Sequence, residues 1–309
     1  MSFKILFMGT PVFAVPILKS LHQSSHKILE VYTQPPKKKN RGQKINISPI
    51  HELSKKINIP VRHPASLESL EELNHIKQLK PDIAVVVAYG KILPAGFLNL
   101  EKITFINIHA SLLPKWRGAA PIQRAIMNCD KETGISIMKI IPKLDAGPVL
   151  ISSKIKITKE INFEKLSEQM SKLGAQLILE ALSLIKNDKA QFVSQIDKDA
   201  TYAKKIEKKE SKINWNLNAK NIVANINALH PNPGSWFEFK GSRIKVLKAI
   251  EVESKSRPGE IVDRNFTIGC LQNAVQILEL QKEGKNKILS SEFIKGNKIE
   301  VGFNILKNV

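Results

Sequence analysis

Cysteine is scarce in this sequence of 309 residues, which contains only Cys129 and Cys270. Two thiols this far apart provide neither a disulfide framework nor a thiolate zinc site. Such scarcity fits a reducing compartment, so we expect a cytoplasmic protein. Long apolar runs are lacking too, because a run such as residues 83–88 falls far short of the roughly 18 to 20 residues that a membrane-spanning helix needs. We expect no membrane span.

The common nucleotide-binding fingerprints are also absent. Residues 3–7 predict a first strand, but Gly9-Thr10-Pro11 follows it in place of Gly-x-Gly-x-x-Gly, and no Gly-Lys-Ser/Thr phosphate loop occurs. These absences argue against a nicotinamide-dependent dehydrogenase and a P-loop NTPase. His22 and His26 have the spacing of a helical metal pair, but the sequence places no third ligand near them. We interpret them as surface residues and expect no bound metal.

Acidic residues are outnumbered, with 28 Asp and Glu against 48 Lys and Arg and a formal net charge of +20. Such an excess favours a polyanionic partner, because basic side chains displace the counterions of phosphates. A general enrichment of lysine in the proteins of the organism would explain part of it. Charge alone therefore leaves nucleic acid, an acidic membrane and a phosphorylated substrate open.

Strand and helix patterns alternate through the first 188 residues. Strands are predicted at residues 3–7, 28–32, 83–88, 103–108, 135–141 and 149–157, and helices at residues 15–21, 49–56, 67–79 and 163–185. The run at residues 83–88 is apolar throughout, which is typical of a parallel sheet covered on both faces. We predict a doubly wound, Rossmann-like α/β domain for residues 1–188.

The pattern changes after this domain. A polar, lysine-containing stretch at residues 187–210 indicates a linker, which we place at residues 189–208. Beyond it we predict a helix at residues 219–229 and short strands at residues 236–239, 244–252, 259–262, 266–270, 274–280 and 287–294. Short strands at such spacing predict a small OB-like β-barrel in residues 209–309.

Polar side chains gather where the predicted strand at residues 103–108 ends. Asn107 and His109 occupy alternate positions, hence one face, and ligands of open α/β sheets bind beyond the carboxyl ends of strands. Either residue could equally serve packing or a loop. Asp145 lies in the turn Lys143-Leu144-Asp145-Ala146-Gly147-Pro148, where aspartate often only caps the turn. Spacing alone does not place it beside His109.

A basic loop follows the second predicted strand, on the ligand side of the sheet. Its cations are Lys37, Lys38, Lys39, Arg41 and Lys44. Most charge runs are simply solvated. At this position the loop could instead bind phosphates.

These motifs resemble those of the methionyl-tRNA formyltransferase family, over essentially the whole chain. Asn107, His109 and residues 111–114 match the signature of the folate-dependent formyltransferases, and residues 144–148 match their aspartate loop. Further matches occur at residues 7–11, 87–94, 115–122, 213–215 and 232–236. Ile141-Pro142-Lys143 departs from the family pattern, which is more acidic before the aspartate loop.

The resemblance implies transfer of a formyl group from 10-formyltetrahydrofolate to the amino group of methionine on initiator tRNA, by a monomer without a metal. It gives Asn107 and His109 the task of stabilising an oxyanion, with His109 also moving a proton beside Asp145. It further implies that the barrel and the basic loop contact tRNA. Folate would be lined by Ser111, Leu112, Leu113 and Pro114.

Two other functions remain open from the sequence. A formyltransferase acting on glycinamide ribonucleotide or an amino sugar nucleotide would share Asn107, His109 and Asp145, but would not need the basic loop. A non-catalytic RNA-binding protein could keep a degenerate α/β domain. The intact set of three polar residues argues against that second alternative.

Overall fold

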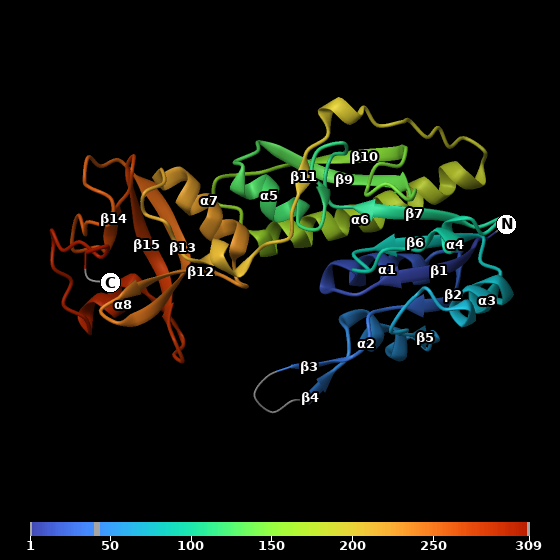
Figure 1. The fold of residues 1–309 in the computed structure, drawn as a ribbon, viewed down its shortest axis with the longest axis horizontal. Helices are drawn as coiled ribbons and strands as arrows, with labels where there is room; N and C mark the ends of the chain where they lie inside the picture. The colour runs from blue at the N-terminus through green and yellow to red at the C-terminus, as the bar shows by residue number, and fades with distance from the viewer. Residues whose placement is uncertain (1, 40–43, 308–309) are drawn as a thin grey trace. The chain divides into compact units, whose positions relative to one another are not determined.

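The computed structural model describes residues 2–39 and 44–307 (Figure 1). Contacts divide the chain into two compact units, each assembled from three segments. The first unit comprises Met1–Gly118, Thr133–Ile155 and Ser167–Tyr202. The second comprises Ala119–Glu132, Lys156–Leu166 and Ala203–Val309. Two segments of the second unit, residues 119–132 and 156–166, therefore lie between segments of the first unit in the sequence.

In the described part of the first unit, a seven-stranded sheet has the order β10-β9-β7-β6-β1-β2-β5. Its strands are β1 (Lys4–Gly9), β2 (Lys27–Tyr32), β5 (Val61–Arg62), β6 (Ile83–Val87), β7 (Thr104–His109), β9 (Glu132–Lys139) and β10 (Val149–Lys156). The five neighbouring strands β5, β2, β1, β6 and β7 pair in parallel, whereas β9 is antiparallel to β7. The predicted α/β class is confirmed, with this antiparallel addition.

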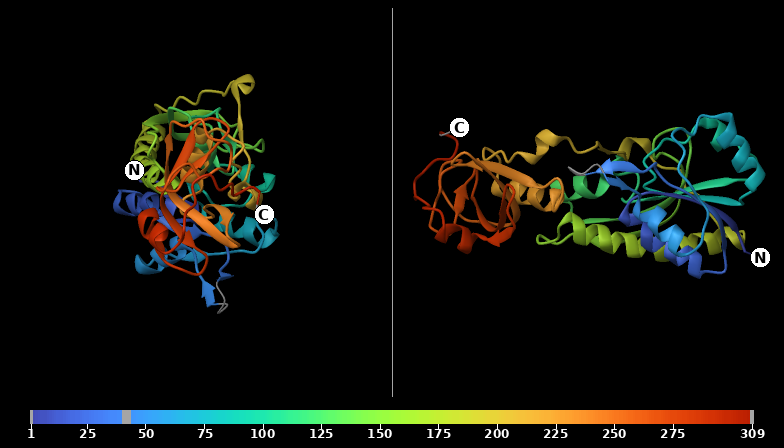
Figure 2. Two further views of the ribbon diagram at one scale, coloured as in Figure 1. Left: turned by 90° about the vertical axis from the view of Figure 1, so that its left-hand side faces the viewer. Right: turned by 90° about the horizontal axis from the view of Figure 1, so that it is seen from below.

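Helices cover both faces of this sheet (Figure 2). They are α1 (Val15–Gln23), α2 (Pro49–Lys56), α3 (Leu70–Leu79), α4 (Ala95–Leu98) and α6 (Phe163–Lys186), preceded by the 3-10 turn η1 (Val12–Ala14). On one face, Gly174 of α6 approaches both Ile108 of β7 and Ile17 of α1. On the other face, Ile76 of α3 and Phe97 of α4 share a core with alternate residues of the strands. This layering leaves the carboxyl ends of the parallel strands at one edge of the sheet.

The second unit contains a curled antiparallel sheet of the order β12-β13-β15-β14, with β16 on β15. Its elements are α5 (Pro121–Met127), α7 (Ala219–Leu229), β12 (Ser235–Phe239), β13 (Ser242–Val252), β14 (Thr267–Gly269), β15 (Ala274–Lys282), β16 (Lys287–Leu289) and α8 (Ser290–Lys295). Aromatic rings fill the concave side, where Trp215 packs edge-on against Phe237 at 5.3 Å. The predicted barrel is thus present as a half-barrel.

Some predicted elements differ from the structure. The strand predicted at residues 287–294 ends at Leu289, and the rest forms α8. Residues 259–262 form no regular strand: Glu260 and Ile261 make only isolated bridges. Part of the predicted basic loop pairs as strands β3 (Lys37–Lys39) and β4 (Lys44–Asn46). Within residues 2–39 and 44–307, no helix is long and apolar enough to span a bilayer.

Candidate active site

The site begins at the end of β7. Phe105, Asn107 and His109 alternate along one face of the strand, so that Asn107 and His109 lie about 7 Å apart along it. His109 is buried, whereas Asn107 is half-buried beside Val86 of β6 and Met138 of β9. Among the described residues, the side-chain amide of Asn107 has no hydrogen-bond partner. Its two N–H groups are therefore available to a ligand.

The ring of His109 is held by the loop that follows it. Its Nε2 atom lies 2.9 Å from the carbonyl oxygen of Trp116. Because a carbonyl oxygen can only accept, Nε2 carries a proton, and Nδ1 is the atom left to gain or lose one. Nδ1 lies 3.7 Å from Oδ2 of Asp145, beyond direct hydrogen-bond range but within reach through a water molecule. The structure thus brings His109 and Asp145 together.

Asp145 occupies a tight turn between β9 and β10. Its backbone has a left-handed φ of 45°, and its Oδ2 atom accepts a 2.8 Å hydrogen bond from the backbone N–H of Gly118. Gly147 lets the turn approach β9, because a Cβ atom there would lie 1.8 Å from the carbonyl oxygen of Lys139. A residue other than glycine with a left-handed backbone is strained, and such residues cluster at functional sites.

The loop of residues 111–114 largely satisfies its own polar groups. Ser111 is buried, and its hydroxyl donates to the carbonyl oxygen of Lys115 at 2.6 Å. Ser136 binds both the carbonyl of Ser111 and the N–H of Leu113. The N–H of Leu112 and the carbonyl of Leu113 bond to none of the other described residues. These two backbone groups can therefore bond to a ligand, whereas the Ser111 hydroxyl already bonds within the loop.

Four of the five predicted phosphate-binding cations lie on the β3–β4 pair. Lys37, Lys38 and Lys39 form β3, and Lys44, at the start of β4, is the register partner of Lys39. Arg41 lies outside the described residues. Pairing of the strands concentrates four lysines on a short ribbon after β2.

Sequence reasoning missed three residues around the Asp145 turn. The side chain of Arg117 is fully buried, and it contacts both Gln195 and Asp197. Gln195 in turn binds the Asp145 turn. Arg117 lies within the segment that matched the family, so its position was a usable signal. Gln195 and Asp197 lie in the polar stretch predicted as a linker, which carries no periodicity to mark them.

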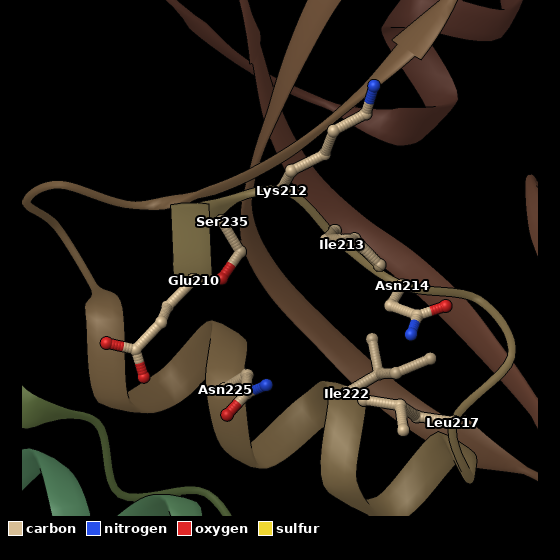
Figure 3. Close-up of a pocket in the computed structure, with 8 residues that line it drawn as sticks. All are labelled: Glu210, Lys212, Ile213, Asn214, Leu217, Ile222, Asn225 and Ser235. Carbon is tan, nitrogen blue, oxygen red and sulfur yellow. The ribbon is translucent and has the colours of Figure 1, made fainter. Parts of the chain in front are cut away.

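Another concave feature is a pocket in the second unit, beside α7 and β12 (Figure 3). It is lined by Glu210, Lys212, Ile213, Asn214, Leu217, Ile222, Asn225 and Ser235. Its empty volume of about 210 Å³ includes space that is open to solvent, so the pocket encloses little room for a small molecule. None of the predicted catalytic residues lines it. Among the described residues, no cluster of His, Cys, Asp and Glu could hold a metal ion.

Comparisons with known proteins agree along the chain. Residues 3–182 match the family model described as formyl transferase, and residues 205–298 match the formyl transferase C-terminal domain. A methionyl-tRNA formyltransferase of Pelagibacter ubique is 51% identical over 307 residues, covering 99% of each chain. Its counterpart in Paramagnetospirillum magneticum is 41% identical over 300 residues, covering 97% of this chain and 98% of that one.

Solved structures share the fold at lower identity. An N-formyltransferase of Helicobacter canadensis has a TM-score of 0.68 at 19% identity, over 89% of this chain and 99% of that one. HypX of Aquifex aeolicus has a TM-score of 0.66 at 18% identity, over 98% of this chain and 51% of that one. Likeness at this level supports the fold, while the full-length sequence relatives carry the finer assignment. On that evidence the chain belongs to the methionyl-tRNA formyltransferase family.

Proposed function

We propose that this protein transfers the formyl group of 10-formyltetrahydrofolate to the free amino group of methionyl-initiator-tRNA, giving the N-formylmethionyl-tRNA that begins translation. The observation that carries the proposal is the 51% identity, over 99% of both chains, to a protein named methionyl-tRNA formyltransferase. The His109–Asp145 pair at the end of β7 supports it chemically. We further propose that the protein acts in the cytoplasm as a monomer.

The reaction needs a neutral amine to attack a carbonyl and an oxyanion to be stabilised. Bound 10-formyltetrahydrofolate supplies the electrophilic formyl carbon. The amide of Asn107, which has no partner among the described residues, donates to the developing oxyanion. Because Nε2 of His109 is bound to the Trp116 carbonyl, Nδ1 is its proton-exchanging atom. Asp145 stabilises the protonated imidazole and accepts, through water, the proton that the amine loses as its bond to the formyl carbon forms. As the bond between the formyl carbon and N10 breaks, N10 of the leaving tetrahydrofolate takes a proton from Nδ1 of His109.

The donor set fits a flat heterocycle such as the pteridine of folate. The Leu112 N–H and the Leu113 carbonyl are an adjacent donor and acceptor that other described residues leave free. We propose that these groups bind the pteridine edge, while the side chains of Leu112, Leu113 and Pro114 line it. The buried Ser111 hydroxyl then shapes the loop from within.

The second unit offers contacts that suit RNA. Its Trp236 ring lies 4.0 Å from the guanidinium carbon of Arg243, and Lys212 lies 5.5 Å from the same ring. Cations stacked on an aromatic ring suit both the phosphates and the bases of a nucleic acid. We propose that this surface and the lysines of β3 and β4 bind tRNA. A small amine acceptor would need neither surface.

A single assay tests the function. Purified protein is incubated with 10-formyltetrahydrofolate and initiator Met-tRNA, and the aminoacyl ester is hydrolysed and examined for N-formylmethionine. We expect rapid formylation of initiator Met-tRNA and little of elongator Met-tRNA. Faster formylation of an amino sugar nucleotide or of glycinamide ribonucleotide would favour the small-amine alternative. No formyl transfer to any amine would contradict the enzyme assignment.

A further inference from the structure

Residues 191–201 of the first unit run beside the Asp145 turn. Val193 and Val149 exchange two backbone hydrogen bonds of 2.8 Å, which fix this segment at the beginning of β10. The segment then forms the short 3-10 turn η2 (Asp197–Asp199). Gln195, two residues beyond Val193, is thereby placed against the turn between β9 and β10.

The side-chain amide of Gln195 binds this turn twice. Its Nε2 atom donates to the carbonyl oxygen of Asp145 at 2.9 Å and to that of Gly147 at 2.7 Å. A primary amide has only two N–H groups, so both are used here. The two carbonyls lie on either side of Ala146, directly after the left-handed φ of 45° at Asp145. Gln195 therefore closes the turn that presents the Asp145 carboxylate.

Gln195 is itself fixed by a buried cation. Its Oε1 atom accepts a 3.0 Å hydrogen bond from Nε of Arg117, whose side chain is 0% exposed. Arg117 also donates to Oδ1 of Asp197 at 2.8 Å. Lys143, which lies in the turn between β9 and β10, pairs with Oδ2 of Asp197. Burying a guanidinium is costly when its hydrogen bonds are not made, and Nη2 of Arg117 already has no partner among the described residues. A reversed Gln195 amide would turn an N–H group toward Nε as well, so the Arg117 contact strongly favours one orientation of this amide.

Three consecutive residues hold both members of the candidate pair. They are Trp116 and the two residues of the short strand β8 (Arg117–Gly118). Trp116 binds the ring of His109 through its carbonyl, and the N–H of Gly118 binds the carboxylate of Asp145. The side chain of Arg117, between them, holds the amide that fastens the Asp145 backbone. Three consecutive residues, Trp116 to Gly118, therefore fix the position of the His109 imidazole relative to the Asp145 carboxylate.

We propose that Gln195 is a positioning residue for Asp145, acting through the carbonyls of the turn and anchored by Arg117. The proposal rests on the proposed function, because its effect is on the rate of that reaction. Without the amide the turn is free to shift, and a displacement of about 1 Å at a reacting group costs on the order of 100-fold in rate. We expect kcat to fall about 10-fold to 100-fold, with the KM values for both substrates within about twofold.

Two substitutions distinguish the acceptor and donor functions of the Gln195 side chain. Gln195→Glu keeps an acceptor for Arg117 but replaces the two donors by an oxygen facing two carbonyls, whereas Gln195→Leu removes both functions at similar size. If donation to the turn matters, Gln195→Glu loses at least as much kcat as Gln195→Leu. A Gln195→Glu variant with wild-type kcat would overturn the proposal. Gln191→Glu, the same change at an exposed position of the same segment, is the matched control and should leave kcat unchanged.

A double-mutant cycle tests whether the effect passes through Asp145. Gln195→Leu is combined with Asp145→Asn, and single-turnover rates are measured with enzyme in excess so that slow variants remain measurable. A positioning residue loses its effect once the group it positions is changed, so we expect Gln195→Leu to slow the Asp145→Asn protein by less than about twofold. Full additivity would show a general structural role and overturn the proposal. Thermal unfolding by circular dichroism checks that each variant is folded.

Failure of the proposed function and failure of the inference give different experimental results. A wild-type protein unable to formylate Met-tRNA would contradict the proposed function and the inference together. An active wild-type protein that keeps its kcat in Gln195→Leu would contradict the inference alone.

Discussion

At the scale of single residues, the candidate site is defined by which atoms are already bound. Nε2 of His109 is bound to a carbonyl, so proton exchange is confined to Nδ1. The amide of Asn107 has no partner among the described residues and is ready to donate. Asn107 is therefore suited to stabilising the charge of the oxyanion, and His109 is suited to moving a proton.

Truncating either residue should affect chemistry more than binding. We expect Asn107→Ala to lower kcat about 100-fold to 1,000-fold, the usual cost of losing one oxyanion donor, and His109→Ala to be at least as slow. The dissociation constant for tRNA should change less than about threefold, because phosphate contacts dominate that affinity. Formylation kinetics and filter binding measure the two quantities. His22→Ala, at an exposed histidine of α1, is the control, and near-normal turnover in His109→Ala would remove it from the mechanism.

A buried carboxylate elsewhere in the first unit gives a pH prediction. Burial of Glu72 raises its pKa, but hydrogen bonds from Arg62 at 2.7 Å and from Tyr32 at 2.8 Å outweigh this, so that the pKa is lowered from 4.5. A group with a lowered pKa in the folded state adds stability above its unfolded pKa, and that stability is lost as pH falls through the folded value. We therefore expect acidification below about pH 4.5 to weaken the fold through Glu72.

Glu72→Gln tests this dependence. The variant should lose about 1 to 3 kcal/mol of unfolding free energy at pH 7, because hydrogen bonds to a charged group are lost. It should also depend less on pH between pH 3 and pH 5 than the wild type. Urea unfolding across this range gives both values. Parallel pH profiles for the two proteins would show that Glu72 is not the group responsible.

At the scale of elements, local patterns were enough for much of the fold. β6 is buried at every position, as its apolar run predicted, and α2 begins where Ser48 accepts a hydrogen bond from the N–H of His51. The strand predicted at residues 287–294 was wrong beyond Leu289, because α8 begins at Ser290. Four apolar residues among eight do not distinguish a short strand from the start of a helix.

The candidate site was predictable only in part. Asn107 and His109 share a strand face because they are two residues apart, which the sequence shows directly. The approach of Asp145 to His109 depends on the turn after β9, and 50 residues separate Asp145 from the Gln195 amide that holds it. No periodic pattern records a contact between two irregular segments. Such contacts follow from the tertiary fold alone.

The turn between β9 and β10 should be sensitive to one added methyl group. Gly147→Ala would place a Cβ atom 1.8 Å from the carbonyl of Lys139, so the turn must move and carry Asp145 with it. We expect kcat to fall on the order of 100-fold. Gly96→Ala in α4, where the nearest atom to the new Cβ lies 3.9 Å away, is the matched control. Equal kcat values for the two variants would show that the turn absorbs the change.

The β3–β4 pair yields a prediction about tRNA. If Lys38 contacts a phosphate, Lys38→Gln should lower the slope of log affinity against log salt by nearly one ion, with little change in single-turnover rate at saturating tRNA. Lys19→Gln, an exposed lysine of α1, serves as the control. The slope is measured by tRNA binding at several salt concentrations. Unchanged slopes for Lys37, Lys38, Lys39 and Lys44 variants would make this ribbon an ordinary solvated surface.

At the scale of the whole molecule, a fragment ending at residue 188 cuts through the first unit. That unit continues to Tyr202 and includes Gln195 and the Val193–Val149 pairing. We expect a fragment of residues 1–202 to melt at least about 4 °C higher than a fragment of residues 1–188, which corresponds to roughly 1 to 2 kcal/mol for a domain of this size. Calorimetry on both fragments measures the difference. Equal melting temperatures would show that residues 189–202 add nothing to the first unit.

The assembly of the second unit from three segments limits how this gene can be recombined. Arg124 of α5 binds Glu210 at 2.5 Å and 3.0 Å, and Asn227 of α7 binds the carbonyl of Lys159. A crossover placed anywhere in residues 189–208 would give a chimera whose second unit combines α5 and residues 156–166 from one parent with a half-barrel from the other. Exchange between relatives therefore succeeds only when α5 and residues 156–166 come from the same parent as the half-barrel, or already match it. We expect α5 and the half-barrel to be inherited together.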